Sequence, residues 1–310
     1  MENTRAKTTR NSLILLLTAT IWGMAFVSQS KGMDYMHPFT FNGVRSLIGA
    51  AGILIYILIS RKIAGDKAAK LDWKLNVKAG LLCGIFLTIA STLQQFGIKY
   101  TSVGKAGFIT TLYIIFVPMF GIFLKKKVAP VVWAAAGMAA VGMYLLCMTE
   151  SLRLGVGDIM VFLCAIAFAI QIMTVDHYAA SIDGAVVSCI QFTVCGVVCC
   201  IGALIWGQPT FGQIQEGLGA LLYAGVLSCG VGYTLQIVGQ KGLNPTVAAL
   251  IMSLESVIAT ISGWIAYKIG FLSTDQTLTP RQIAGCVIVF AAVILVQLPP
   301  EWFCFGKKND

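Results

Sequence analysis

Charged residues are scarce in this chain. Only 11% of its 310 residues are charged, whereas 57% are hydrophobic, and the mean hydropathy is +0.83. A soluble domain carries roughly 25% charged residues. The composition therefore leaves no room for a large water-soluble domain.

The residue patterns of several kinds of enzyme are also missing. Neither of the two histidines, His37 and His177, stands at metal-ligand spacing to a second ligand, so we predict no metal site. The ten cysteines include no CxxC pair and lie mostly in apolar stretches, which is typical of small buried residues; redox chemistry stays open only for the vicinal pair Cys199 and Cys200. No GxxxxGK[ST] phosphate-binding loop occurs, which argues against ATP hydrolysis by this chain. The sequence predicts no cofactor.

Long apolar stretches fill most of the chain instead. A membrane-spanning helix needs roughly 20 mostly apolar residues, and ten stretches have about that length: 11–30, 38–60, 78–98, 106–124, 130–148, 158–174, 185–206, 218–238, 246–267 and 282–298. The first follows a short basic leader, as in a signal peptide, but nine more follow it and no small-residue cleavage site appears. The sequence predicts an all-α integral membrane protein with ten transmembrane helices.

The basic residues indicate how the chain lies in the membrane. The formal charge is +9, and Lys and Arg tend to remain on the cytoplasmic side of a membrane protein. With the N-terminus inside, fifteen Lys and Arg fall in inner segments, chiefly in 61–78 and 125–127, and six fall outside. This bias predicts a cytoplasmic-membrane protein with short cytoplasmic tails, 1–10 and 300–310, and no nucleic-acid partner. A homodimer stays open.

A weak internal repeat divides the chain into two halves. At an offset of about 146, Phe168 and Ala169 align with Trp22 and Gly23, and Gln191 aligns with Arg45. The two five-helix repeats are then 11–148 and 155–299. Because each unit has an odd number of spans, the second enters the membrane from the opposite side, which predicts inverted repeats.

Several segments resemble the EamA branch of the drug/metabolite transporter superfamily, and the resemblance covers nearly the whole chain. Its motifs are TATIWGMAFV and FTFNGVRSLIGA in the first two spans, KYTSVGKAGFITTLYIIFVPMFGIFL in the fourth, GVGDIMVFLCAIAFAIQIM in the sixth and ALIMSLESVIATISGWIAY in the ninth. One departure is Ser256, where relatives usually carry proline. The resemblance implies a secondary transporter that exports amino acids or related small metabolites by alternating access.

Two ionisable residues lie within the spans, and a charge there costs at least roughly 2.5–3.5 kcal/mol near mid-depth. Glu255 has two interpretations: a proton carrier or counter-ion for a substrate ammonium, or a structural acid that stays hydrogen-bonded. Arg45 either faces a central cavity and grips a carboxylate, or extends to the outer interface.

Other side chains within the spans are candidates for a cavity wall, since amides and hydroxyls do not favour lipid. They are Trp22, Asn42, Gln94, Gln95, Thr110, Thr111, Tyr113, Gln171, Gln191, Tyr233 and Gln236. Bonding to neighbouring helices is the alternative for the polar members, and core packing for the aromatic ones. Lys105, at the mouth of the fourth span, either attracts anions or anchors its helix.

Other functions remain as alternatives. Within transport these are exchange of sugar phosphates or nucleotide sugars and efflux of apolar cations; sugar-phosphate exchange calls for more cations than Arg45 and Lys105 supply. A membrane-embedded lipid-modifying enzyme generally needs clustered His, Asp or Glu, and the sequence has no such cluster.

Overall fold

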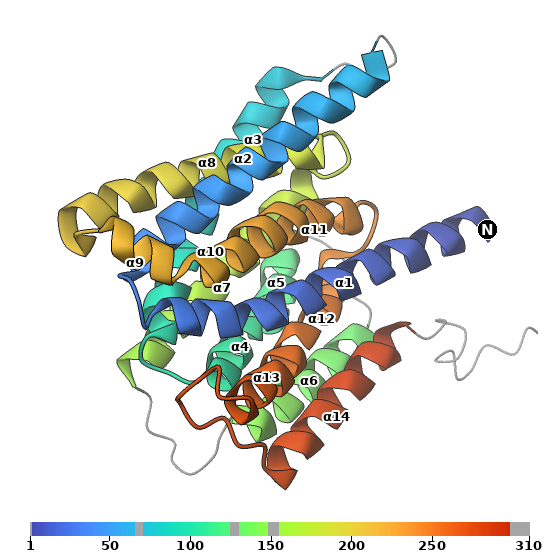
Figure 1. The fold of residues 1–310 in the computed structure, drawn as a ribbon. Coiled ribbons are helices and arrows are strands. Elements are labelled where there is room, and N and C mark those ends of the chain that lie inside the picture. Colours follow the sequence, from blue (N-terminus) through green and yellow to red (C-terminus); the bar gives the residue numbers. More distant parts are fainter. Residues whose placement is uncertain (1, 66–70, 125–129, 148–154, 298–310) are drawn as a thin grey trace, which may run out of the picture.

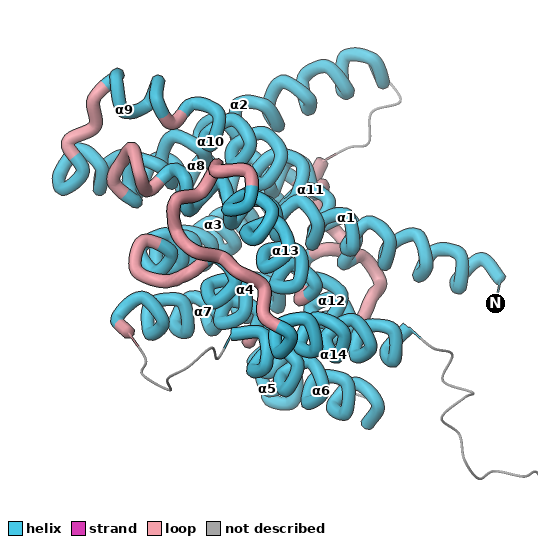
Figure 2. Tube along the Cα trace, turned by 60° about the horizontal axis from the view of Figure 1, so that its bottom comes forward, coloured by secondary structure: helices cyan, strands magenta, loops and turns pink. Residues whose placement is uncertain are grey.

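The computed structural model describes residues 2–65, 71–124, 130–147 and 155–297, and in these ranges every regular element is a helix. The predicted tail 300–310 and the basic segment 125–127 lie outside the described residues. Residues predicted as an N-terminal tail are helical, because α1 (Glu2–Gly32) begins at Glu2. Figure 2 shows the described part of the chain as helices joined by loops.

Helices occupy all ten of the predicted positions within the described residues. Eight are long and apolar enough to cross a membrane: α1, α2 (Pro38–Ala64), α3 (Trp73–Ile98), α4 with α5 (Val103–Thr111, Tyr113–Phe123), α7 (Val156–Tyr178), α8 (Gly184–Gly202), α10 with α11 (Leu218–Leu222, Tyr233–Gln240) and α12 with α13 (Pro245–Met252, Leu254–Lys268). The other two, α6 (Pro130–Cys147) and α14 (Pro280–Gln297), have shorter apolar stretches. The chain is thus a multi-pass helical membrane protein.

Local sequence sets where these helices begin. His37 and Asn244 each precede a proline at the first helical position, where the missing amide costs nothing, and each caps the following helix through its side chain. Asp72 and Asp183 cap α3 and α8 in the same way. The caps satisfy amides that the first turn leaves without intrahelical partners.

Four of the long spans are not uniform α-helices. A single non-helical residue separates α4 from α5, at Leu112, and α12 from α13, at Ser253. A π-helical segment, Tyr223–Gly232, joins α10 to α11, and another, Ala203–Gly207, extends α8. Along the chain, the short helix α9 (Phe211–Glu216) lies between α8, with its π-helical extension, and α10.

The helices pack closely where small residues remove side-chain bulk. A Cβ on Gly97 of α3 would stand 2.8 Å from the carbonyl oxygen of Gly157 on α7, so the two backbones touch. In Figure 1, α2, α3 and α8 lie together, and α6 and α14 pack against one another at the opposite side of the bundle. All the spans except α6 and α14 surround a central cavity.

Candidate functional site

A buried cavity lies at the centre of the bundle. Eight of the ten helical stretches contribute side chains to it, and α6 and α14 do not. Its free volume is about 30 Å³, which is room for roughly two water molecules. A pocket for a small organic ligand is commonly about 300–1,000 Å³, so in this conformation the cavity is closed around its lining.

Aromatic rings form one wall of the cavity. The ring centroids of Trp22 and Tyr233 are 4.5 Å apart, and those of Phe192 and Tyr233 are 4.9 Å apart at an interplanar angle of 83°. Trp22 Nε1 donates to the carbonyl oxygen of Ser228, at 3.4 Å, within the π-helical segment. Together these tilted and edge-on contacts join α1, α8 and α11 in one aromatic wall.

The cavity's acid lies beside a helix interruption. Glu255 follows Ser253 by two residues, is 4% exposed, and accepts a hydrogen bond from the Tyr113 hydroxyl at 3.0 Å. Tyr113 itself follows the interruption at Leu112. The bond therefore links the two spans that are interrupted by a single residue.

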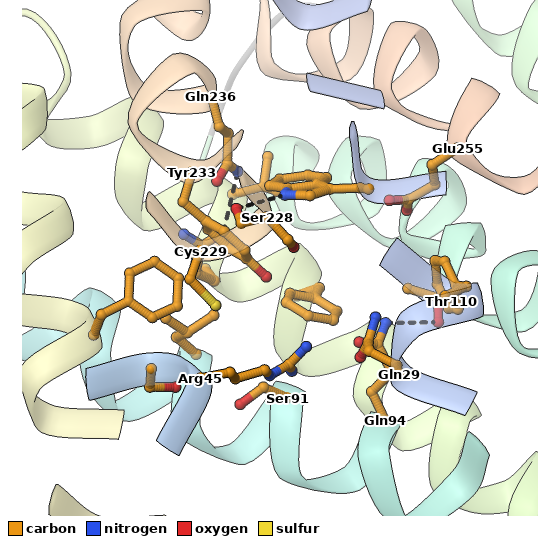
Figure 3. A pocket seen from close by; sticks show the side chains of 18 of the residues that line it. Gln29, Arg45, Ser91, Gln94, Thr110, Ser228, Cys229, Tyr233, Gln236 and Glu255 are labelled. Atoms are coloured by element: carbon orange, nitrogen blue, oxygen red, sulfur yellow. Dashed lines mark hydrogen bonds between the residues drawn. The ribbon is translucent and has the colours of Figure 1, made fainter. Parts of the chain in front are cut away.

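The cavity's cation has no anionic partner in the part of the chain that the structure describes. Arg45 is 5% exposed and lines the cavity, and its guanidinium carbon lies 5.4 Å from the centre of the Phe41 ring. Its Nε has no hydrogen-bond partner. Figure 3 shows Arg45 and Glu255 approaching the cavity from different sides. The geometry therefore leaves the guanidinium turned to the cavity rather than to the membrane surface.

Two pairs of polar side chains complete the wall. Gln94 Nε2 donates to Thr110 Oγ1 at 3.2 Å, and Gln236 Nε2 donates to Gln171 Oε1, also at 3.2 Å. Each pair joins two different helices, and Figure 3 shows the first of them as a dashed line. The amides are thus held in place while their remaining donors and acceptors stay near the cavity.

The structure brings together nine of the predicted site residues and leaves the others outside. The nine are Trp22, Arg45, Gln94, Thr110, Tyr113, Gln171, Tyr233, Gln236 and Glu255. Asn42 donates to the Ser91 carbonyl, Gln95 to the Gln29 carbonyl and Thr111 to the Phe108 carbonyl. Gln191 is fully buried away from the cavity. Three of these four side chains therefore donate to a backbone carbonyl and do not line the cavity.

Lys105 also lies outside the cavity lining. Its ammonium forms an ion pair with Asp158, which also accepts hydrogen bonds from Thr101 Oγ1 and the Gly155 amide, both at 2.9 Å. This cluster joins the start of α4 to the start of α7. Within the described residues, no group of three or more His, Cys, Asp or Glu is placed to hold a metal ion.

Sequence reasoning missed ten residues that line the cavity. They are Phe26, Gln29, Ser46, Leu87, Ser91, Phe168, Ile172, Phe192, Ser228 and Cys229. Most are apolar or small and polar, and such residues are common throughout the spans, so their type did not indicate a place in the cavity. Phe168 could have been found, because the repeat aligns it with the candidate Trp22.

Comparisons with known proteins identify the family. The EamA-like transporter family matches residues 10–148 and again residues 155–298. An uncharacterized transporter of Archaeoglobus fulgidus is 28% identical over 92% of this chain and 84% of its own, and the uncharacterized transporter YwfM of Bacillus subtilis is 25% identical over 94% of each. A protein of known crystal structure shares the fold, with a TM-score of 0.70 at 16% identity over 93% of this chain and 96% of its own. The chain belongs to the EamA-like transporter family.

Proposed function

We propose that the protein is a secondary transporter that exports amino acids or related small metabolites across the cytoplasmic membrane. The observation that carries this proposal is the pairing of a buried cation, Arg45, which has no anionic partner among the described residues, with a buried acid, Glu255, on different walls of one closed cavity. A zwitterion offers a carboxylate to the first and an ammonium to the second. The aromatic wall at Trp22 and Tyr233 suits an apolar side chain on the substrate.

We further propose that the two halves are inverted repeats related by a two-fold axis through the cavity. Support comes from fourteen of the nineteen lining residues, which fall into seven pairs at two sequence offsets. The offset is 146 for Trp22/Phe168, Phe26/Ile172 and Ser46/Phe192, and 142 for Leu87/Cys229, Ser91/Tyr233, Gln94/Gln236 and Tyr113/Glu255. Such pairing is expected when two equivalent units face one another across a common centre.

Contacts between helices repeat at the same offsets. A Cβ on Gly97 would meet Val161, and a Cβ on Gly239 would meet Leu15. Leu15 and Val161 stand 146 positions apart, and Gly97 and Gly239 stand 142 apart. Each contact therefore has a counterpart with the two halves exchanged.

A second pair of glycine contacts gives the same result. Gly84 approaches Val194 and Gly225 approaches Ile48, with Val194 and Ile48 again 146 positions apart. Gly84 and Gly225 are 141 positions apart, whereas the pairs from Leu87/Cys229 onward are 142 apart, so the second half has gained one residue between Gly225 and Cys229. The π-helical segment Tyr223–Gly232 accommodates the extra residue, because its i→i+5 turns hold one residue more than α-turns.

Transport then requires the halves to move. A free volume of about 30 Å³ is too small for an amino acid, so the cavity opens and closes as one half rocks against the other. The bond between Tyr113 and Glu255 crosses that boundary. We propose that Glu255 couples transport to a proton, exchanging its bond to Tyr113 for a bond to the substrate or the proton.

A flux measurement tests the function. Cells producing the intact protein are loaded with an amino-acid mixture, and the medium is compared by mass spectrometry with that of cells producing Glu255→Gln at equal membrane abundance. Glu216→Gln, on the exposed helix α9, is the matched control. We expect particular amino acids to be enriched only with the intact protein and the control.

Two other results would change the proposal. If Glu255→Gln exports as much as the intact protein, the proposal of a transporter stands and the proposed proton-carrier role of Glu255 is wrong. Export of no amino acid by any variant would turn the assay to phosphorylated sugars and apolar cations. Among the described residues, Arg45 is the one cation that lines the cavity, which favours a substrate with a single carboxylate over a phosphorylated sugar.

A further inference from the structure

A second cavity lies away from the central one, beside the C-terminal parts of α2 and α11. Its volume is about 540 Å³, and Arg61, Asp72, Asp183 and Lys241 line it. None of its lining residues belongs to the central cavity. It therefore has to be explained separately from substrate binding.

This cavity continues into an apolar groove on the side of the bundle. The groove has a volume of about 420 Å³, lies between α2 and the span made by the π-helical segment and α11, and shares Tyr56, Thr234 and Val238 with the cavity. α2 packs tightly on the π-helical segment, where a Cβ on Gly49 would stand 2.8 Å from the Gly225 carbonyl, but it makes few contacts with α11. The two helices diverge toward the cavity (Figure 1).

The repeat shows why this space is open. At the opposite end of the bundle, Phe39, Phe96 and Trp206 pack together, with ring centroids 5.1 Å apart for the first two and 5.6 Å for Phe39 and Trp206. Their counterparts at the same offsets, 146, 142 and 146, are Ala185, Val238 and Ser60, and all three line the second cavity. Among the described residues, aromatic rings fill one end of the bundle, whereas smaller side chains leave a cavity at the equivalent end.

Two bases and two acids line the second cavity, and each acid already caps a helix. Asp183 Oδ1 accepts hydrogen bonds from the Ala185 and Val186 amides, and Asp72 Oδ1 accepts one from the Leu75 amide, so both acids complete helix N-termini. Lys241 Nζ has three donors, and within the described ranges it donates one hydrogen bond, to the Ile182 carbonyl at 3.1 Å. The Arg61 guanidinium carbon lies 6.0 Å from the centre of the Trp73 ring.

We propose that this cavity and groove bind one anionic phospholipid of the surrounding bilayer. Its phosphate lies between Arg61 and Lys241, at the level where lipid headgroups sit, and an acyl chain lies in the apolar groove between α2 and α11. Lys and Arg side chains between transmembrane helices are the chemistry that recognises such headgroups, and here both acids of the lining are engaged by helix N-terminal amides. The lipid takes the place that Phe39, Phe96 and Trp206 occupy at the other end.

Native mass spectrometry of the purified full-length protein tests the site. The protein is titrated in detergent with dioleoyl phosphatidylglycerol or dioleoyl phosphatidylcholine, and the adduct that survives activation is measured. We expect one phosphatidylglycerol to be retained in preference to phosphatidylcholine. The double variant Arg61→Gln/Lys241→Gln should lower this retention at least about tenfold, the effect of losing one charge-assisted hydrogen bond. Lys74→Gln/Lys78→Gln, which changes two exposed lysines of α3 outside the cavity, should retain it.

A second variant tests the groove by rebuilding the aromatic packing. Ser60→Trp/Val238→Phe should abolish the adduct while the protein still unfolds at the normal temperature in phosphatidylcholine. Equal retention of both lipids by the wild type, or normal phosphatidylglycerol binding by either cavity variant, would overturn the proposal. Displacement of the lipid by millimolar inorganic phosphate would also overturn it, since the acyl chain would then contribute nothing.

Discussion

Replacing Arg45 with methionine should make the protein more stable and transport-deficient at once. The side chain is 5% exposed, lies within a span, and makes no hydrogen bond or ion pair with the described residues. A cation at mid-membrane costs at least roughly 2.5–3.5 kcal/mol, a cost that falls toward the ends of a span. Arg45 is the eighth residue of α2, and its contact with the Phe41 ring returns about 0.5–2 kcal/mol. At the mid-membrane value the difference leaves a net cost of about 0.5–3 kcal/mol, which Arg45→Met removes.

Thermal unfolding of the purified protein in detergent measures this gain. About 1 kcal/mol shifts the midpoint by roughly 2–4 °C in a protein of 150–250 residues, so we expect a rise of a few degrees. Lys105→Met is the contrasting control, since it leaves Asp158, which is 4% exposed, without its cation and should lower stability by about 1–3 kcal/mol. A lower midpoint for Arg45→Met than for the wild type would refute the reasoning, because it would reveal a stabilising partner for the guanidinium.

Transport by an Arg45→Lys variant tests whether the site needs only a positive charge or also the shape of the guanidinium. Arg45→Lys keeps the positive charge but loses the planar fork that binds a carboxylate through two parallel hydrogen bonds. Loss of one such bond, about 1.5–3 kcal/mol, should weaken substrate affinity roughly tenfold or more. Uptake into proteoliposomes at varied substrate concentration measures the change, and an affinity within twofold of the wild type would contradict the two-pronged grip.

Three further predictions follow from the packing. Gly97→Ala should lower stability by about 1–3 kcal/mol, since its Cβ would lie 2.8 Å from the Gly157 carbonyl oxygen; Gly52→Ala, with nothing within 4 Å, should stabilise α2 slightly, and equal midpoints for the two variants would exclude a tight α3–α7 contact. A double-mutant cycle of Tyr113→Phe and Glu255→Met, which has no oxygen to accept the bond, should give a coupling of about 1.5–3 kcal/mol for a bond to a carboxylate, and additive effects would rule that bond out. In a variant retaining only Cys229, which is 2% exposed, N-ethylmaleimide should react slowly and more slowly still with substrate present, whereas fast labelling unaffected by substrate would place this thiol outside the transport cavity.

The helical positions and the family could be predicted from the sequence because both depend on local patterns. A run of about 20 apolar residues satisfies its own backbone hydrogen bonds only as a helix in lipid, so hydropathy alone located the helices. The motif order around Trp22, Arg45 and Glu255 indicated the family that the matches over both halves establish. The length criterion is met by eight of these helices, since α6 and α14 have shorter apolar stretches.

The cavity residues were only partly predictable. A polar residue within a span has to find a partner, but sequence does not say whether that partner is a cavity neighbour or a backbone carbonyl. Asn42 and Gln95 were as polar as Gln94 and yet bond to carbonyls of neighbouring helices. Serines such as Ser46 and Ser91 were missed because a small hydroxyl is common anywhere in a helix.

The sequence by itself determined that the chain is a helical membrane protein of a transporter family, with one acid and one cation in its spans. Only the tertiary structure decided that Glu255 bonds to Tyr113, that Arg45 has no counter-ion among the described residues, and that Ser60, Ala185 and Val238 leave a cavity where their counterparts form an aromatic cluster. The physical reason is that hydropathy is a property of each segment, whereas a side chain's partner depends on how helices far apart in the sequence rotate and cross.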